Sequence, residues 1–221
     1  MRATDAQIAH WETAANDAVF TLPIDAHWFR HQLEPGSRIL DYGCGYGRIL
    51  AQLDDLGFAK LAGVDASAAM LERARQRLPA ADLRVCRGTP TPHADASFDA
   101  VLLIAVLTCV PADADQQALV EEIRRLLRPG GLLYLCDFLL RSDDRNLQRY
   151  REQEPVHGTY GVFALDDGLP LRHHDPAWVR ELLRPFESLE FESFEATTML
   201  GNPATGFRFA GRKPFSQPTA S

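Results

Sequence analysis

The stretch ILDYGCGYGRIL, residues 39–50, decides the fold. A short apolar run ends in an acid, Asp41, and glycines follow at alternate positions, Gly43, Gly45 and Gly47. Glycine has no Cβ, so a glycine-rich turn after a strand lets the backbone approach a ligand closely. A dinucleotide site has the spacing G-x-G-x-x-G. Here the third glycine comes one residue early and Arg48 takes the expected place, which disfavours a dinucleotide.

Downstream of this turn, apolar runs alternate with amphipathic segments. We expect strands to begin at Arg38 and to occupy 60–65, and further strands within 82–88, 97–110 and 132–140. A helix follows the glycines and ends at Gly57, a second begins at an N-cap, Ser67, and the clearest one starts at 113 and must stop before Pro129. Strands that alternate with helices predict a doubly wound α/β fold.

The segments before and after this alternating region follow a different pattern. Residues 4–33 read as one or two helices, and residues 141–174 form a polar, aromatic insert too long for a simple connection. After the insert, Asp175 caps a helix that begins at Pro176, and two alternating strands follow. We therefore expect a mainly parallel seven-stranded sheet with an antiparallel C-terminal hairpin, helices on both faces and an N-terminal helical cover.

These segments form one expected domain, residues 1–221. Its parts are the helical cover at 1–35, the ligand-binding core at 36–140, the lid or substrate insert at 141–174, the final helix and hairpin at 175–213, and a tail at 214–221.

Composition narrows the possible partners. The formal charge of −7 disfavours nucleic acid and anionic membranes as partners, because both need a basic surface. The four cysteines are far apart without metal-ligand spacing, and the N-terminus lacks the apolar core of a signal peptide. The longest apolar run, residues 100–110, is too short to span a bilayer. We expect a soluble, cytoplasmic protein without a metal, monomeric or homodimeric.

Several landmarks together resemble a known family. DYGCGYG matches the acid-x-G-x-G-x-G motif of class I methyltransferases that use S-adenosylmethionine. GVD ends the second expected strand, 24 residues after Asp41, FDAVLLI stands where the fourth strand of the family does, and LLRPGGLLYL resembles its helix–turn–fifth strand signature. The resemblance covers residues 36–140, and the terminal hairpin at 189–212 also fits it.

The resemblance implies S-adenosyl-L-methionine as the cofactor. Asp41 would face its amino group, and Asp65 would accept hydrogen bonds from both ribose hydroxyls. The alternatives without a ligand are that Asp41 caps the following helix and that Asp65 only begins a turn. The family often has an acid after the third strand that reads adenine, whereas this chain has Gly88-Thr89-Pro90, so Thr89 or a backbone carbonyl takes that role. The implied cofactor-binding residues are Asp41, Gly43, Cys44, Gly45, Gly47, Asp65, Ala66, Met70, Thr89 and Ala105.

The reacting centre is less defined by the sequence. A methyl group on a sulfonium is already electrophilic, so alignment matters most and a base is needed only if the acceptor must lose a proton. We take Tyr160, His174 and Asp137 as candidate catalytic residues, with His157 and His173 as further candidates. Aromatic residues in the insert (Tyr150, Tyr160, Phe163) and near the N-terminus (Trp11, Trp28, Phe29) either line the acceptor pocket or pack the core.

Three functions remain open at this point. The first is methylation of a small molecule by in-line transfer. The second is another use of the cofactor, such as cyclisation of its aminobutyrate part to azetidine-2-carboxylate with release of methylthioadenosine. The third is cofactor binding without catalysis. Hydride transfer with NAD is the weakest alternative, because of the glycine spacing.

Overall fold

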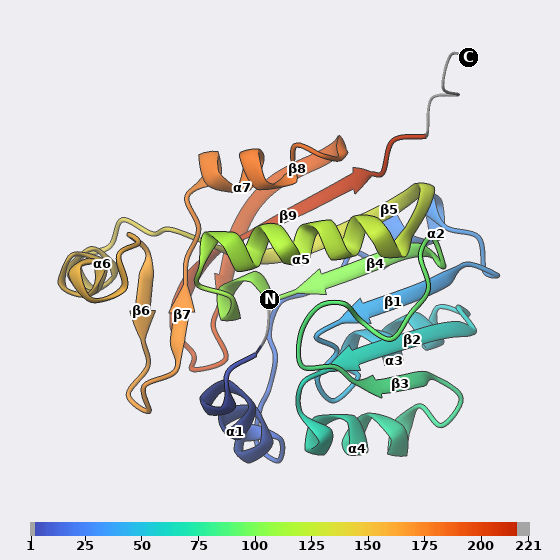
Figure 1. Cartoon of the computed structure of the whole chain (residues 1–221), viewed down its shortest axis with the longest axis horizontal. Coiled ribbons are helices and arrows are strands. Elements are labelled where there is room, and N and C mark those ends of the chain that lie inside the picture. Colours follow the sequence, from blue (N-terminus) through green and yellow to red (C-terminus); the bar gives the residue numbers. More distant parts are fainter. Residues whose placement is uncertain (1–2, 216–221) are drawn as a thin grey trace.

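A computed structural model describes residues 3–215, so most of the expected tail, residues 216–221, lies outside the described part. One sheet of seven strands organises these residues, in the order β3-β2-β1-β4-β5-β9-β8 (Figure 1). The strands are β1 (Arg38–Tyr42), β2 (Lys60–Asp65), β3 (Asp82–Val85), β4 (Phe98–Ile104), β5 (Leu127–Leu139), β8 (Glu187–Thr197) and β9 (Pro203–Arg212).

The first five strands are parallel, and the last two form an antiparallel hairpin. β1 pairs with β2 and with β4, and β9 lies between β5 and β8, antiparallel to both. This is the predicted topology. The carboxyl ends of the parallel strands share one edge of the sheet, which is where ligands bind in open α/β folds.

Helices cover both faces of the sheet, so the central strands are buried on both sides. On one face lie α5 (Asp113–Leu126) and α7 (Pro176–Leu183), whose apolar side chains join those of Leu103 and Leu135. The other face is covered by α2 (Ala26–Gln32), α3 (Arg48–Asp55) and α4 (Ala68–Arg77).

Two predicted helix caps are confirmed in detail. The Ser67 hydroxyl accepts a hydrogen bond from the amide of Met70 at 3.1 Å, at the start of α4. The Asp175 carboxylate accepts one from the amide of Ala177 at 2.6 Å, and Pro176 takes the first helical position of α7. Each side chain satisfies an amide that the helix itself leaves unpaired.

The structure adds three details to the expectation. β5 already begins at Leu127, with a register irregularity where β4 pairs first with Leu127 and then with Leu132. The N-terminal helices, α1 (Asp5–Ala14) and α2, are separated by an extended segment. The insert contains a long helix, α6 (Asp144–His157), and a small hairpin of β6 (Val162–Ala164) and β7 (Pro170–Arg172).

In Figure 1, α6 and the β6–β7 hairpin lie beyond the carboxyl ends of the parallel strands, and α1 lies at the same end of the molecule. Within residues 3–215, no helix is both long and apolar enough to pass through a bilayer.

Candidate functional site

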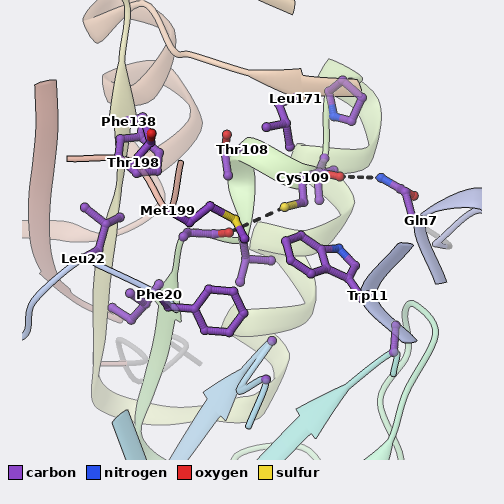
Figure 2. A pocket seen from close by; sticks show the side chains of 18 of the residues that line it. Gln7, Trp11, Phe20, Leu22, Thr108, Cys109, Phe138, Leu171, Thr198 and Met199 are labelled. Carbon is purple, nitrogen blue, oxygen red and sulfur yellow. Dashed lines mark hydrogen bonds between the residues drawn. The ribbon is translucent and has the colours of Figure 1, made fainter. Parts of the chain in front are cut away.

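A cavity of about 340 Å³ lies at the carboxyl ends of β1, β2 and β4. Its walls come from the turns that follow the parallel strands, including the glycine turn, and from α1 with the following segment, the insert and the β8–β9 turn. The lining includes Trp11, Phe20, Asp41, Asp65, Thr108, Phe138, Arg149, Phe163, His173 and Met199. Figure 2 shows Trp11, Phe20, Thr108, Phe138 and Met199 gathered around this space.

The glycine turn leaves no room for side chains. Gly43 and Gly45 have φ values of +77° and +51°, a region that side chains disfavour. A Cβ on Gly43 would lie 2.5 Å from Val106 Cγ2, and a Cβ on Gly45 would lie 2.6 Å from Phe20 Cε2. The turn therefore presents bare backbone at the end of β1, with Phe20 and Val106 packed directly against it.

Asp41 and Arg48 place opposite charges beside this turn. Asp41 is buried, with 2% of its surface exposed, and it lies one residue before the end of β1. Burial raises its pKa to about 7; Arg48 opposes this shift and Asp65 adds to it. Arg48 donates to the Leu22 carbonyl at 2.5 Å, but its buried Nε has no acceptor among the described residues. Both side chains line the cavity and have polar capacity left for a ligand.

Asp65 is fixed by backbone amides at the end of β2. Its two carboxylate oxygens accept from the amides of Gly45 and Ser67, each at 2.8 Å. Burial raises the pKa of Asp65, while these amide bonds oppose the shift. The first bond links the glycine turn after β1 to the acid at the end of β2. Each oxygen has a second lone pair that a hydroxyl donor can use.

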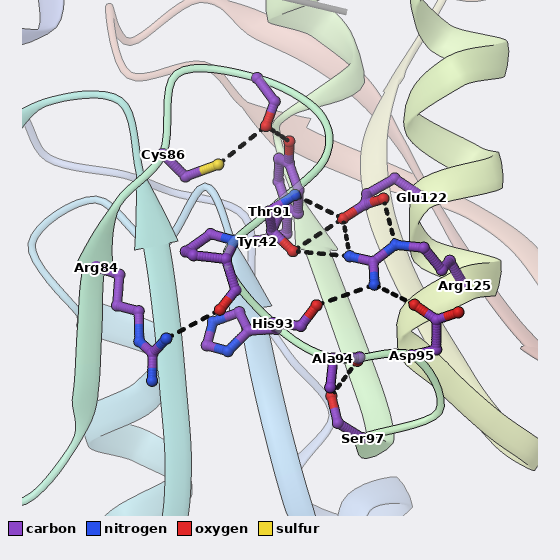
Figure 3. Close-up of polar contacts among 12 residues, drawn as sticks. Tyr42, Arg84, Cys86, Thr91, His93, Ala94, Asp95, Ser97, Glu122 and Arg125 are labelled. Carbon is purple, nitrogen blue, oxygen red and sulfur yellow. Dashed lines mark hydrogen bonds and ion pairs between the residues drawn. The ribbon is translucent and has the colours of Figure 1, made fainter.

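A network of polar side chains supports the loop after β3 (Figure 3). Glu122, on α5, accepts from the Thr91 amide at 2.7 Å, from the Thr91 hydroxyl at 2.8 Å and from Arg125 at 2.6 Å. Burial raises the pKa of Glu122, but these hydrogen bonds outweigh it and the net pKa is lowered. The Cys86 thiol contacts the Gly88 carbonyl at 2.9 Å. The network holds the segment that lines the cavity at Cys86 and Gly88.

α1 covers the cavity from the N-terminal side. Gln7 donates to the Cys109 carbonyl at 2.6 Å, and Glu12 accepts from the Ala68 and Ala69 amides at the start of α4. His10 Nδ1 lies 2.5 Å from Asp167 Oδ2, in the loop between β6 and β7. α1 thus joins the turn after β4 and the start of α4 to the insert. Trp11 projects into the space beneath it (Figure 2).

The N-terminal aromatic residues divide between the two roles considered from sequence. Trp11 lines the cavity together with Phe20. Trp28 and Phe29 instead pack against Tyr134 on β5, with ring centroids 5.0 Å and 4.8 Å away.

The insert contributes a mixed aromatic and basic wall. The Arg149 guanidinium lies 3.5 Å from the centroid of the Phe163 ring, and its Nη2 is 3.4 Å from His173 Nδ1. The Tyr150 hydroxyl, buried behind this wall, lies 2.6 Å from the same nitrogen. Phe163, Arg149 and His173 reach the cavity, while Tyr160 packs edge-on against Tyr150 at 5.4 Å between centroids.

The three candidate catalytic residues lie outside the cavity lining. Tyr160 is on the surface, with 36% of its area exposed. Asp137 is fully buried and accepts from the amides of Thr108 at 3.1 Å and Phe138 at 2.8 Å; burial raises its pKa to about 7. His174 is also fully buried, 4.0 Å from Asp137, and burial lowers its pKa to about 4. Their catalytic roles stay predictions, which this placement does not support.

Most of the predicted cofactor-binding residues, unlike the candidate catalytic residues, line the cavity. The structure brings most of them to one wall of the cavity, namely Asp41, Gly43, Cys44, Gly45, Asp65, Ala66, Met70 and Ala105. Gly47 and Thr89 are not part of the lining. Gly47 instead precedes α3, and Thr89 comes just before Pro90, beyond the lining residue Gly88.

Sequence reasoning missed several lining residues. Arg149 and Asn146 lie on α6, and Met199 and Leu200 lie in the β8–β9 turn. An apolar pair in a turn was the only available signal for Met199 and Leu200.

Comparison with known proteins identifies a methyltransferase domain. Residues 40–135 match a methyltransferase domain model, a range that begins within β1 and includes the glycine turn, β2 to β4 and most of β5. A SAM-dependent methyltransferase from Methanosarcina mazei has a similar structure, with a TM-score of 0.82 and 25% identity over 88% of this chain and 100% of that one.

Two curated relatives agree with this match. The 27-O-demethylrifamycin SV methyltransferase of Amycolatopsis mediterranei is 32% identical over 61% of this chain and 52% of its own length. A demethylmenaquinone methyltransferase of Beutenbergia cavernae is 37% identical over 54% of this chain and 50% of its own. The chain spans about half the length of these curated relatives. The fold, the match of residues 40–135 to a methyltransferase domain and the similar structure together confirm the predicted cofactor, S-adenosyl-L-methionine, and the predicted resemblance to class I S-adenosylmethionine-dependent methyltransferases.

Proposed function

We propose that the protein methylates a small-molecule acceptor by in-line transfer from S-adenosyl-L-methionine. The cavity carries this proposal, because one continuous space is lined both by the glycine turn and by the aromatic insert. Its volume of about 340 Å³ falls within the range of small-molecule sites, about 300–1,000 Å³. Two relatives, named for rifamycin and menaquinone precursors, support a small-molecule acceptor.

The residues present fit the cofactor. The glycine turn leaves space that a Cβ would fill, and buried Arg48 Nε lacks an acceptor. We assign Asp65 to the ribose hydroxyls, Asp41 to the amino group and Arg48 to the carboxylate of the methionine part. Charge-assisted hydrogen bonds of this kind are about twice as strong as neutral ones.

When bound, the cofactor supplies a methyl group on a positively charged sulfur, which a nucleophile attacks from the opposite side. The chain has to align the two reactants and exclude water, and alignment contributes up to roughly 7–11 kcal/mol in favourable cases. α1 closes the site through Gln7 and Glu12, and Trp11 and Phe20 supply its apolar surface. These contacts keep the acceptor dry and oriented.

Asp137 and His174 act as positioning residues in this scheme. Asp137 holds the turn after β4 through the Thr108 amide, and Gln116 contacts both His174 and the Val110 carbonyl. The Thr108 hydroxyl donates to the Arg172 carbonyl at 2.9 Å, which ties this turn to the insert. The turn lines the cavity from Ala105 to Val110, except Leu107, so its position defines the space left for the acceptor.

The protein's place in the cell belongs to the same proposal. All four cysteines are free thiols. Reduced thiols support a cytoplasmic protein, since disulfides persist mainly in oxidising compartments.

Product analysis tests the function. The purified protein is incubated with S-adenosyl-L-methionine and a panel of small-molecule acceptors, and the products are separated by mass spectrometry. We expect S-adenosylhomocysteine and a methylated acceptor, and we expect an Asp65→Asn variant to give much less of both. Methylthioadenosine formed from cofactor alone would instead establish cyclisation to azetidine-2-carboxylate. Cofactor that binds and stays intact with every acceptor would favour a non-catalytic role.

A further inference from the structure

Arg149 is a cation without a carboxylate partner in the wall of the cavity. It is half-buried on α6, and no carboxylate lies within 4 Å of its guanidinium among residues 3–215. Its Nε is buried without an acceptor, and its Nη2 has only His173 Nδ1, at 3.4 Å. Burial lowers the pKa of Arg149, and a hydrogen bond with Tyr150 and the charge of Asp143, which forms no salt bridge with it, offset this only in part. A desolvated charge without a counter-ion is costly unless a ligand supplies one.

His173 presents a hydrogen-bond donor beside this cation. Arg149 can only donate, so His173 Nδ1 is the acceptor of its contact. The Tyr150 hydroxyl lies 2.6 Å from the same nitrogen and 3.4 Å from Asn146 Oδ1, and it donates to the nearer acceptor, His173 Nδ1. The proton of the neutral ring therefore lies on Nε2, for which the described residues provide no hydrogen-bond partner. Burial and the charge of Arg149 lower the pKa of His173 to about 3, so the ring stays neutral. A neutral ring with this tautomer donates from Nε2.

We propose that Arg149 and His173 bind a carboxylate on the acceptor, so that the substrates are monocarboxylates with an apolar body. The inference rests on the proposed function and names its substrate class. The guanidinium of Arg149 and the imidazole N–H of His173 match a single negative charge, and guanidinium pairs with carboxylate in a planar, two-bond geometry; Arg145, which also lines the cavity, is exposed to solvent. The apolar body finds its surface on Phe138, Phe163, Leu171, Met199 and Leu200.

The position of Arg149 separates this carboxylate from that of the cofactor. Asp41 and Arg48 flank the glycine turn after β1, whereas α6 follows β5, two strands away in the sheet. Two strand spacings amount to about 10 Å. The cofactor carboxylate has Arg48 close by, which leaves Arg149 for the acceptor.

The test compares matched acids and amides. Benzoate with benzamide and octanoate with octanamide are titrated calorimetrically into the protein saturated with S-adenosylhomocysteine. We expect at least one acid to bind about 10- to 100-fold more tightly than its amide, the value of a charge-assisted hydrogen bond. In Arg149→Met this ratio falls to about one, while affinity for S-adenosylhomocysteine is unchanged. Arg151→Met, an exposed arginine on the same helix, is the control and keeps the ratio.

Several outcomes overturn the proposal. These are equal binding of acid and amide, no acid binding up to about 10 mM, or an acid preference that survives in folded Arg149→Met. A large loss of S-adenosylhomocysteine affinity in that variant would assign Arg149 to the cofactor instead. The wild-type comparison decides alone if Arg149→Met does not fold. None of these results requires turnover, so methyl transfer can still be observed if the carboxylate preference fails.

Discussion

The protonation state of Asp41 should control cofactor binding near neutral pH. Burial raises the pKa of this carboxyl to about 7, so in the free protein it is mostly protonated below that pH. The amino group of the cofactor is a cation and pairs with the ionised form. Binding therefore releases a proton from Asp41 below pH 7, and the apparent Kd should rise by about tenfold for each pH unit that the pH falls. Above pH 7 the Kd should level off.

Isothermal titration with S-adenosylhomocysteine between about pH 5.5 and 8.5 measures this slope. Asp41→Asn removes the charge, so its Kd should be about 10- to 100-fold weaker at pH 8 and nearly independent of pH. Asp137→Asn is the matched control, since burial raises the pKa of Asp137 to about 7 as well, yet this residue does not line the cavity. A pH slope that persists in Asp41→Asn, or disappears in Asp137→Asn, would refute the reasoning.

Two further predictions use pairs of variants. Gly45→Ala should cost roughly 1–2 kcal/mol of stability for its positive φ and should also abolish measurable cofactor binding, because its Cβ meets Phe20. Gly57→Ala, at φ +93° with open space around it, should lose stability alone; equal cofactor affinity in both variants would contradict this. Glu122→Gln should lower the free energy of unfolding in urea by about 1–3 kcal/mol, through its buried hydrogen bonds, and Glu121→Gln, which is exposed, by less than about 0.5 kcal/mol. Hydrogen bonding lowers the pKa of Glu122 in the folded protein, so the stabilisation by Glu122 should be present above its unfolded pKa and decline as the pH falls through its folded pKa. A difference in the free energy of unfolding between Glu122→Gln and Glu121→Gln that grows at low pH would disprove this.

The fold around the glycine turn could be predicted well from the sequence because its signals are local. The glycine turn, the cap at Ser67 and the apolar runs each depend on a few neighbouring residues. Asp41 and Asp65 are placed by the ends of two parallel strands, so their convergence follows from the topology alone.

The acceptor half could not be predicted in the same way. His173 and His174 are adjacent in an extended segment, where successive side chains point to opposite sides. His173 therefore reaches the cavity, and His174 turns toward Gln116. Which of the two points inward depends on how the segment after β7 aligns with β5, a long-range contact made by Leu139 and His174. Arg149 likewise depends on the packing of α6.

Cofactor selectivity tests the central claim most directly. Isothermal titration of the wild-type protein with S-adenosyl-L-methionine and, separately, with NAD compares the two ligands that a glycine turn after a first strand can hold. We predict binding of S-adenosyl-L-methionine, a loss of about 10- to 100-fold in affinity in a folded Asp65→Asn variant, and no binding of NAD. Binding of NAD without binding of S-adenosyl-L-methionine would contradict the account.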